Sequence, residues 1–280
     1  MSHSHCRSAE ELLRAAGAET LRWNGAELNS HFQPIFSVRR QGCVGHEALV
    51  RASGEGRVPL APSRLFAEAF ASGRGVELDW ICRALHLRNF ARMDPGEGML
   101  LLNVHCAAAV EDASAAGEFA DMVRFYGLVP QRVCVEMLED HCIDEPGLRA
   151  AVGAYRGLGT RIAMDDFGTG RSNFDRIVAL RPDIVKMDRS ILIDAVGDEK
   201  SRNMLPAIIE LLHEAGAQVA VEGIESANEA LIAIESGADL LQGYYFALPA
   251  AKLDDGAFGT AILTRLLRMR GHTLTAVAAG

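Results

Sequence analysis

Short apolar runs alternate along the chain with longer segments in which apolar residues recur every three or four positions, as on one face of a helix. Eight runs predict strands near residues 30–38, 44–52, 99–104, 132–138, 161–166, 183–188, 218–223 and 238–246. Helices are predicted at residues 62–73, 77–93, 117–127, 146–159, 201–216 and 226–237, and a Gly often closes the segment. Each of these helices is expected to be amphipathic and to cover a sheet. The order predicts an α/β fold, a TIM-like (β/α)8 barrel.

Polar residues collect where the apolar runs end. They are Asn103, Glu136, Asp165 with Asp166, Lys186, Glu222 and Gln242. A single polar residue after an apolar run can simply mark the strand leaving the core. In a barrel, however, the strand ends share one rim, and each pair of like charges about 4 Å apart there would cost roughly 4 kcal/mol. A cation is therefore expected among the carboxylates.

Asp165 and Asp166 are adjacent, although successive strand residues face opposite sides. They can reach a common centre only if the backbone turns sharply, and we expect the glycines of "FGTG" (167–170) to supply that turn. Carboxylates with one amide, and no matching His or Cys, suit Mg²⁺ or Mn²⁺ rather than Zn²⁺. We interpret the pair as a bridge between two such ions, an arrangement used for in-line phosphoester hydrolysis.

A nucleophilic hydroxyl is the alternative to a metal-activated water. Thr169 and Ser172 lie close to the two aspartates in sequence, but only His105 follows a neighbouring predicted strand and could activate them. We expect His105 to pack or to form a hydrogen bond rather than to act as a base.

Composition excludes some classes of protein. Lys and Arg number 28 against 37 Asp and Glu, a net charge of −9 without any basic run, which disfavours binding to a long nucleic acid. The six cysteines form no C-x-x-C pair and are interpreted as reduced thiols. No apolar run approaches the roughly 18 residues of a membrane span, and the N-terminus lacks the apolar core of a signal peptide. We therefore expect a cytoplasmic protein.

Seven motifs carry a resemblance to a known family. They are "HEALVR" (46–51), "NV" (103–104), "EMLE" (136–139), "DDFGTG" (165–170), "VKMD" (185–188), "VEGIE" (221–225) and "QGYYFALP" (242–249). In order and spacing they resemble the EAL-domain cyclic-di-GMP phosphodiesterases, over residues 28–249. The resemblance implies a TIM-like barrel with one antiparallel strand. It also implies hydrolysis of cyclic di-GMP to linear pGpG with two Mg²⁺ or Mn²⁺ ions.

The resemblance further assigns metal ligands by position. The ligands of the first ion are Glu47, Asn103, Glu136 and Asp165. Asp165 bridges to the second ion, which Asp166 and, directly or through water, Glu222 complete.

Other roles follow in the same way. Lys186 is matched to the group that orients the attacking water, and Gln242 to a residue that positions water and substrate. Gln33 and Arg51 are matched to substrate contacts, the arginine to a phosphate oxygen. Glu139 is matched to the glutamate that supports the "DDFGTG" loop.

The sequence departs from the family pattern after "DDFGTG", where Arg171, Asn173 and Phe174 replace the usual residues. This loop lies near the family's dimer contacts, and the resemblance implies a homodimer. Residues 1–27 are too short for a sensory or cyclase domain and are predicted to hold one short helix. We expect a stand-alone phosphodiesterase barrel at residues 28–280.

Two other functions compete with hydrolysis of cyclic di-GMP. One is an inert receptor that binds cyclic di-GMP and signals through an unidentified regulatory partner, but such proteins typically lose metal ligands and this chain keeps them all. The other is a barrel enzyme acting on an unrelated phosphate ester, which the motifs leave without support. The prediction is a phosphodiesterase.

Overall fold

The computed structural model describes residues 19–93, 96, 98–112, 116–138, 144–169 and 174–278, with the backbone alone at residues 112, 116 and 270–278. The chain divides into two compact units. The first unit holds residues 1–32, 47–162 and 249–253, and the second holds residues 33–46, 163–248 and 254–280. The predicted short helix near the N-terminus lies outside the described residues.

The strands are β1 (Leu21–Trp23), β2 (Ala26–Ser37), β3 (Gly42–Ser53), β4 (Pro59–Leu60), β5 (Met99–His105), β6 (Val133–Leu138), β7 (Arg161–Phe167), β8 (Ile184–Met187), β9 (Gln218–Val221) and β10 (Leu240–Leu241). The α-helices are α2 (Pro62–Ala71), α3 (Gly75–Met93), α4 (Cys106–Asp112), α5 (Ala116–Phe125), α6 (Glu145–Gly157), α7 (Phe174–Leu180), α8 (Arg189–Gly197), α9 (Glu199–Glu214), α10 (Ala227–Glu235) and α11 (Ala257–Ala278). Two 3₁₀ turns, η1 (Glu55–Arg57) and η2 (Pro130–Arg132), complete the elements.

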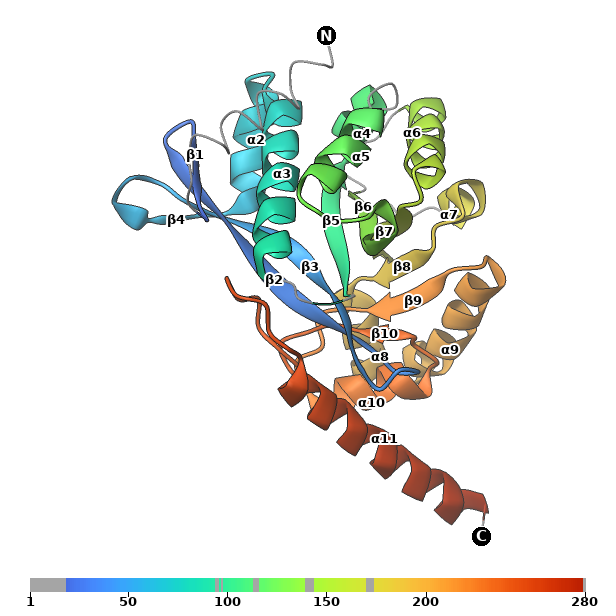
Figure 1. Ribbon diagram of the computed structural model, residues 1–280. Helices are drawn as coiled ribbons and strands as arrows, with labels where there is room; N and C mark the ends of the chain where they lie inside the picture. The colour runs from blue at the N-terminus through green and yellow to red at the C-terminus, as the bar shows by residue number, and fades with distance from the viewer. Residues whose placement is uncertain are drawn as a thin grey trace. The chain divides into compact units, whose positions relative to one another are not determined.

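The strands are hydrogen-bonded in the order β1-β2-β10-β9-β8-β7-β6-β5-β3-β4, and β2 also pairs with β3, so the strands from β2 to β3 close on themselves (Figure 1). The pairs β7–β8, β8–β9 and β9–β10 are parallel, as is β5–β6. β2 instead runs antiparallel to β10. The predicted α/β barrel, with one strand reversed, is confirmed.

In the first unit, α3 and α4 pack against β5, and α4 and α5 pack against α6. We expected residues 77–93 to form an amphipathic helix, and this is wrong, because every residue of α3 from Leu78 to Phe90 is buried. The buried polar groups of α3 have partners. Asp79 pairs with Arg83, while His86 and Asn89 both bond the hydroxyl of Ser30.

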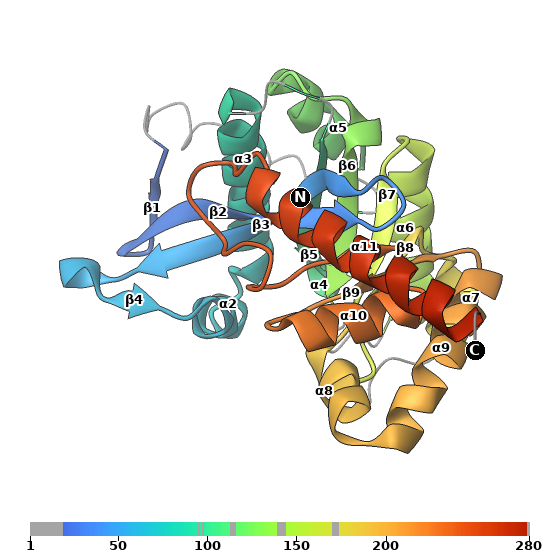
Figure 2. The same ribbon diagram turned by 90° about the horizontal axis from the view of Figure 1, so that it is seen from below.

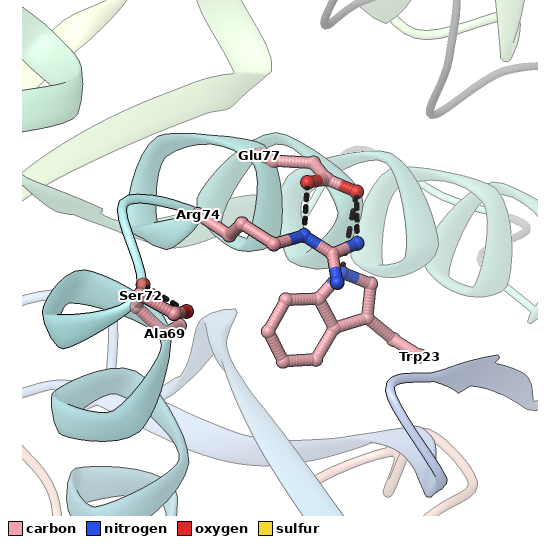
Figure 3. Close-up of polar contacts among 5 residues, drawn as sticks. All are labelled: Trp23, Ala69, Ser72, Arg74 and Glu77. Atoms are coloured by element: carbon pink, nitrogen blue, oxygen red, sulfur yellow. Dashed lines mark hydrogen bonds and ion pairs between the residues drawn. The ribbon is translucent and has the colours of Figure 1, made fainter.

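The start of α3 is also fastened to β1 (Figure 3). Arg74 donates from Nε and Nη2 to the carboxylate of Glu77 at 2.8 and 2.7 Å, and its guanidinium lies 4.8 Å from the centre of the Trp23 ring. The indole nitrogen of Trp23 donates to Glu77 at 3.4 Å. The first turn of α3 is thereby held by a strand distant in sequence.

In the second unit, α8 packs against α9 and α10, α9 packs against β9, and α11 runs beside α10 (Figure 2). Helices α4, α7 and α8 are 7, 7 and 9 residues long, and such short segments show barely two turns of helical periodicity. The sequence prediction missed them, and it also missed α11, β1 and β4. Within the described ranges, no helix is both long and apolar enough to cross a membrane.

The last strand is predicted at residues 238–246, but in the structure it comprises only the two residues of β10. The chain must turn there because the backbone of Gly243 passes against Ile224. A Cβ atom on Gly243 would lie 2.1 Å from the carbonyl oxygen of Ile224. The amide of Tyr245 then donates to that same oxygen at 2.9 Å. Gln242 is therefore left at the end of the parallel strands.

Replacing Gly243 with Ala should lower the free energy of unfolding by about 2 kcal/mol, since the contacting atoms are backbone and cannot move aside. Gly153 is the matched control. It lies inside α6 with open space where its Cβ would be, so Gly153→Ala should stabilise the protein by about 0.5–1 kcal/mol. Urea unfolding of both variants checks this, and equal stabilities would contradict it.

Candidate functional site

In the first unit, three predicted ligands lie at neighbouring strands. Asn103 of β5 and Glu136 of β6 are paired in the parallel register, so their side chains point to the same face of the sheet. The side-chain amide of Asn103 donates to Oε1 of Glu47 in β3 at 2.9 Å. Glu47 and Glu136 are both buried. The fold thus brings two carboxylates and one amide together.

Arg51 lies on the same strand as Glu47, four residues further along, and is half-buried. Its Nη1 donates to the carbonyl oxygen of Val50 at 3.0 Å. Burial, with the charge of Arg51, lowers the pKa of His86 to about 3, although Glu47 acts in the opposite sense. Burial also lowers the pKa of His31, and Arg51 adds to this effect. Both imidazoles near Arg51 are therefore neutral at pH 7.

In the second unit, Lys186 of β8 lies between two predicted ligands. Its Nζ atom is 2.6 Å from Oε1 of Glu222 and 3.6 Å from Oδ1 of Asp165. The Lys186 side chain is only 2% exposed, against 14% for Asp165 and 22% for Glu222. A lysine ammonium of the chain itself therefore lies between these two carboxylates.

The backbone turn at the two aspartates occurs at Asp166. The pairing of β7 with β8 shifts register between Met164 and Phe167, which is a β-bulge, and Asp166 has φ of 55°. The turn therefore begins one residue before the glycines that we expected to supply it, because Asp tolerates the left-handed region better than most residues. Gly168 contributes next, since its φ is 107° and a Cβ there would meet Ile191 at 2.2 Å. Asp165 is partly buried and Asp166 is exposed.

Gln33 and Gln242 form a buried amide pair in the same unit. Nε2 of Gln242 donates to Oε1 of Gln33 at 3.3 Å, and Nε2 of Gln33 donates to the carbonyl oxygen of Ala247 at 3.2 Å. The backbone amide of Gln242 donates to the carbonyl oxygen of Val221, one residue before Glu222. Gln242 is therefore held beside the strand end that carries Glu222.

Sequence reasoning missed Arg189 and Glu225, which form a two-pronged ion pair. This pair joins the segments that follow Lys186 and Glu222. Backbone bonds link the same strand ends, from Asp188 to Phe167 at 3.1 Å and from Glu222 to Met187 at 3.3 Å. Glu225 could have been noticed, because it closes the "VEGIE" motif.

Several predicted residues remain to be placed. Glu139, Ser172, Arg171 and Asn173 lie outside the described residues. The hydroxyl of Thr169 donates to the backbone oxygen of Asp166 at 3.1 Å, which ties it to the turn.

The prediction that His105 packs is confirmed. Its ring lies 4.5 and 4.9 Å from those of Phe66 and Phe70.

The chemistry of these side chains fits hard divalent cations, which prefer carboxylate and amide oxygens. Oδ1 of Asp165 is buried and accepts no hydrogen bond among the described residues, and the charge facing it is the ammonium of Lys186 at 3.6 Å. No group of three or more His, Cys, Asp or Glu side chains that could hold an ion occurs in the described part of the chain. Within each unit two acids are related through a third residue: Glu47 and Glu136 lie on the strands that flank Asn103, and Asp165 and Glu222 lie on either side of Lys186.

Comparison with known proteins identifies relatives over most of the chain. The sequence model of the EAL domain matches residues 14–249. A Pseudomonas aeruginosa protein named cyclic di-GMP phosphodiesterase NbdA is 30% identical over 240 residues, which cover 82% of this chain and 30% of that protein. An uncharacterized Azorhizobium caulinodans protein is 32% identical over 248 residues, 84% of this chain and 33% of that protein. The chain thus spans about a third of the length of these relatives.

Solved structures share the fold. An EAL domain protein from Listeria monocytogenes superposes with a TM-score of 0.71 at 25% identity, covering 80% of this chain and 89% of that one. Klebsiella pneumoniae BlrP1, solved in complex with manganese and cyclic di-GMP at pH 6, gives a TM-score of 0.72 at 22% identity, covering 81% and 57%.

The depressed pKa of His86 predicts a pH effect on stability. Between pH 6.5 and pH 3 the unfolded chain binds a proton at this residue that the folded chain does not, so the free energy of unfolding should fall as pH drops, by up to about 1.4 kcal/mol per unit. His86→Gln should therefore show a shallower decline than the parent protein in urea unfolding at pH 4 to 6.5. Parallel declines would show that His86 is protonated in the folded protein.

Proposed function

Because the chain belongs to the EAL domain family, we propose that it is a metal-dependent phosphodiesterase that hydrolyses cyclic di-GMP to linear pGpG. The observation that supports this most is Lys186, buried between the carboxylates of Asp165 and Glu222. A lysine held so close to two potential metal ligands can orient a water molecule beside bound ions.

The proposed metal ligands are those assigned by resemblance. Glu47, Asn103, Glu136 and Asp165 would hold one Mg²⁺ or Mn²⁺ ion, and Asp165, Asp166 and Glu222 would hold the second. When bound, such a pair of ions acidifies a water molecule and neutralises charge on the phosphoryl oxygens. The proposal is supported by the bulge at Asp166, which lets two consecutive carboxylates leave the alternating pattern of the strand.

The chain's own residues then act on water and substrate. Lys186 orients the attacking water, and its position is fixed by Glu222. Gln242 positions water and substrate, and Gln33, its hydrogen-bond partner, contacts the substrate. Arg51 binds a phosphate oxygen, and the two neutral histidines beside it do not compete as cations for that anion. Glu139 supports the loop after Asp166.

We place this reaction in the cytoplasm. The cysteines that the structure describes, Cys43, Cys82, Cys106 and Cys134, are free thiols, which suits a reducing compartment. Its substrate is a small cyclic dinucleotide rather than a long nucleic acid, as the net charge of −9 supports. A regulatory protein partner would act on the same barrel.

Incubating the protein with cyclic di-GMP and Mg²⁺ or Mn²⁺, and separating the products by chromatography, tests the proposal. We expect pGpG. Ca²⁺ should support little turnover, because it takes longer bonds and looser coordination than Mg²⁺. Tight binding without product would establish the receptor function instead, and full activity in Ca²⁺ would contradict the two-ion account.

Variants in the same assay separate the roles of the two aspartates. Asp165→Asn should abolish turnover and weaken the binding of both ions, since a neutral amide cannot offset two divalent charges. Asp166→Asn should lose most turnover but keep the first ion and appreciable affinity for cyclic di-GMP. Lys186→Ala should lose turnover while keeping both ions. Calorimetry gives the number of metal ions bound per chain. If the Asp165→Asn variant still bound two ions, Asp165 would not be the ligand shared by both.

We also propose a homodimer formed through the elements that follow "DDFGTG". Helices α8 and α9 expose large apolar side chains, with Ile193 50% and Met204 60% exposed. Ile193→Asp should shift the protein toward monomer in analytical ultracentrifugation. Val58→Asp is the control, since Val58 is 64% exposed in the other unit and should not affect assembly. A parent protein that stays monomeric at high concentration would refute the dimer.

A further inference from the structure

Helix α3 contains a buried ion pair, Asp79 with Arg83, that contacts the end of β5. Asp79 is 2% exposed and Arg83 is fully buried, and the guanidinium donates from Nε to Oδ1 of Asp79. Arg83 also donates from Nη1 to the hydroxyl of Tyr155 in α6 at 3.0 Å. Its guanidinium lies 4.8 Å from the centre of the Trp80 ring. These contacts fix the carboxylate of Asp79 from the side of the helices.

The second oxygen of the same carboxylate reaches the β5 strand. Oδ2 of Asp79 accepts a hydrogen bond from the backbone amide of His105 at 3.0 Å. His105 is the last residue of β5, and α4 begins at the next residue. His105 also lies opposite Leu138 in the parallel pairing of β5 with β6, so its amide sits where the strand passes into the helix. Asp79 therefore links the helix α3 directly to the end of β5.

His105 is held on its other side as well, because its ring packs against Phe66 and Phe70. The start of α3 is anchored in turn by Glu77, which pairs with Arg74 beside Trp23 (Figure 3). Asp79 is thus held by contacts of α3 with α6 and β1 in addition to its contact with β5.

This anchored residue lies two positions beyond Asn103, the amide that contacts Glu47 and is paired with Glu136. We propose that Asp79 is a positioning residue, which holds the end of β5 so that the side chain of Asn103 faces the two carboxylates. The inference rests on the proposed function, in which these three residues hold the first metal ion.

A buried ion pair is a costly way to fix a helix, because hydrophobic residues of similar size often stabilise a core equally well or better. Such residues could not accept the hydrogen bond from His105. The ability to accept this hydrogen bond separates a positioning role of Asp79 from a purely structural one. It can be tested with a matched pair of double variants.

The test compares Asp79→Asn/Arg83→Met with Asp79→Leu/Arg83→Met. Both remove the two charges together, so neither leaves an unpaired buried ion, and Asn and Leu are similar in size. Only asparagine keeps an oxygen that can accept from His105. We expect the two melting temperatures to be similar, but the leucine variant to bind Mn²⁺ about tenfold more weakly, as seen for partners of metal ligands.

A second comparison adds Asn103→Ala to both double variants. If Asp79 acts through Asn103, the difference in Mn²⁺ affinity between them should disappear, since coupled residues are not additive. Should leucine prevent folding, Asp79→Ala/Arg83→Met makes the same comparison without excess volume. Calorimetry with Mn²⁺ alone, alongside thermal unfolding without metal, provides the readouts.

Equal Mn²⁺ affinities in the asparagine and leucine variants would overturn the inference, as would a parent protein that binds no Mn²⁺. A difference that persists in the Asn103→Ala background would also overturn it, because Asp79 would then act on another residue. A parent protein that binds Mn²⁺ but yields no pGpG would refute the proposed function and leave this inference intact if the affinities differ as expected.

Discussion

The buried ammonium of Lys186 is the interaction on which the second unit of the barrel depends. Burying a lysine costs several kcal/mol unless it is paired, and here Glu222 lies at 2.6 Å and Asp165 at 3.6 Å. The same contact removes the repulsion between the two carboxylates. Asp165 lies in β7, Lys186 in β8 and Glu222 directly after β9, so the ion pairs require the parallel order of these neighbouring strands. The Arg189–Glu225 pair then holds the segments that follow Lys186 and Glu222.

The first unit also buries a positively charged side chain, and there the charge is balanced by a different ion pair. Asp79 and Arg83 neutralise each other inside α3, where no water can reach them. Each unit therefore contains a fully buried cation whose carboxylate partner lies at or contacts the end of a strand. Burial gives these contacts their strength, since charges interact far more strongly at low dielectric than in water. It also explains why removing one partner alone should be more harmful than removing both.

The alternating apolar runs predicted most of the barrel because strand and helix periodicities are local properties of the sequence. β5, β6 and β7 begin and end within one residue of prediction. What the sequence could not predict depends on contacts between distant segments. β10 ends early because Gly243 passes over the backbone of Ile224. The buried face of α3 depends on partners such as Tyr155, 72 residues from Arg83, and His105, 26 residues from Asp79.

The sequence predicted which residues form the candidate site better than it predicted how they are arranged. The motifs named Lys186, Asp165 and Glu222, but not that the lysine itself supplies the positive charge between them. They located the turn at the aspartates but assigned it to glycines, while the bulge lies at Asp166. Anomalous diffraction at the manganese edge, from crystals soaked with Mn²⁺, tests the account most directly. The proposed two-ion site predicts two Mn²⁺ peaks. Both should contact Asp165, and one of them should also contact Glu47, Asn103 and Glu136. A single peak, or peaks that do not contact Asp165, would contradict it.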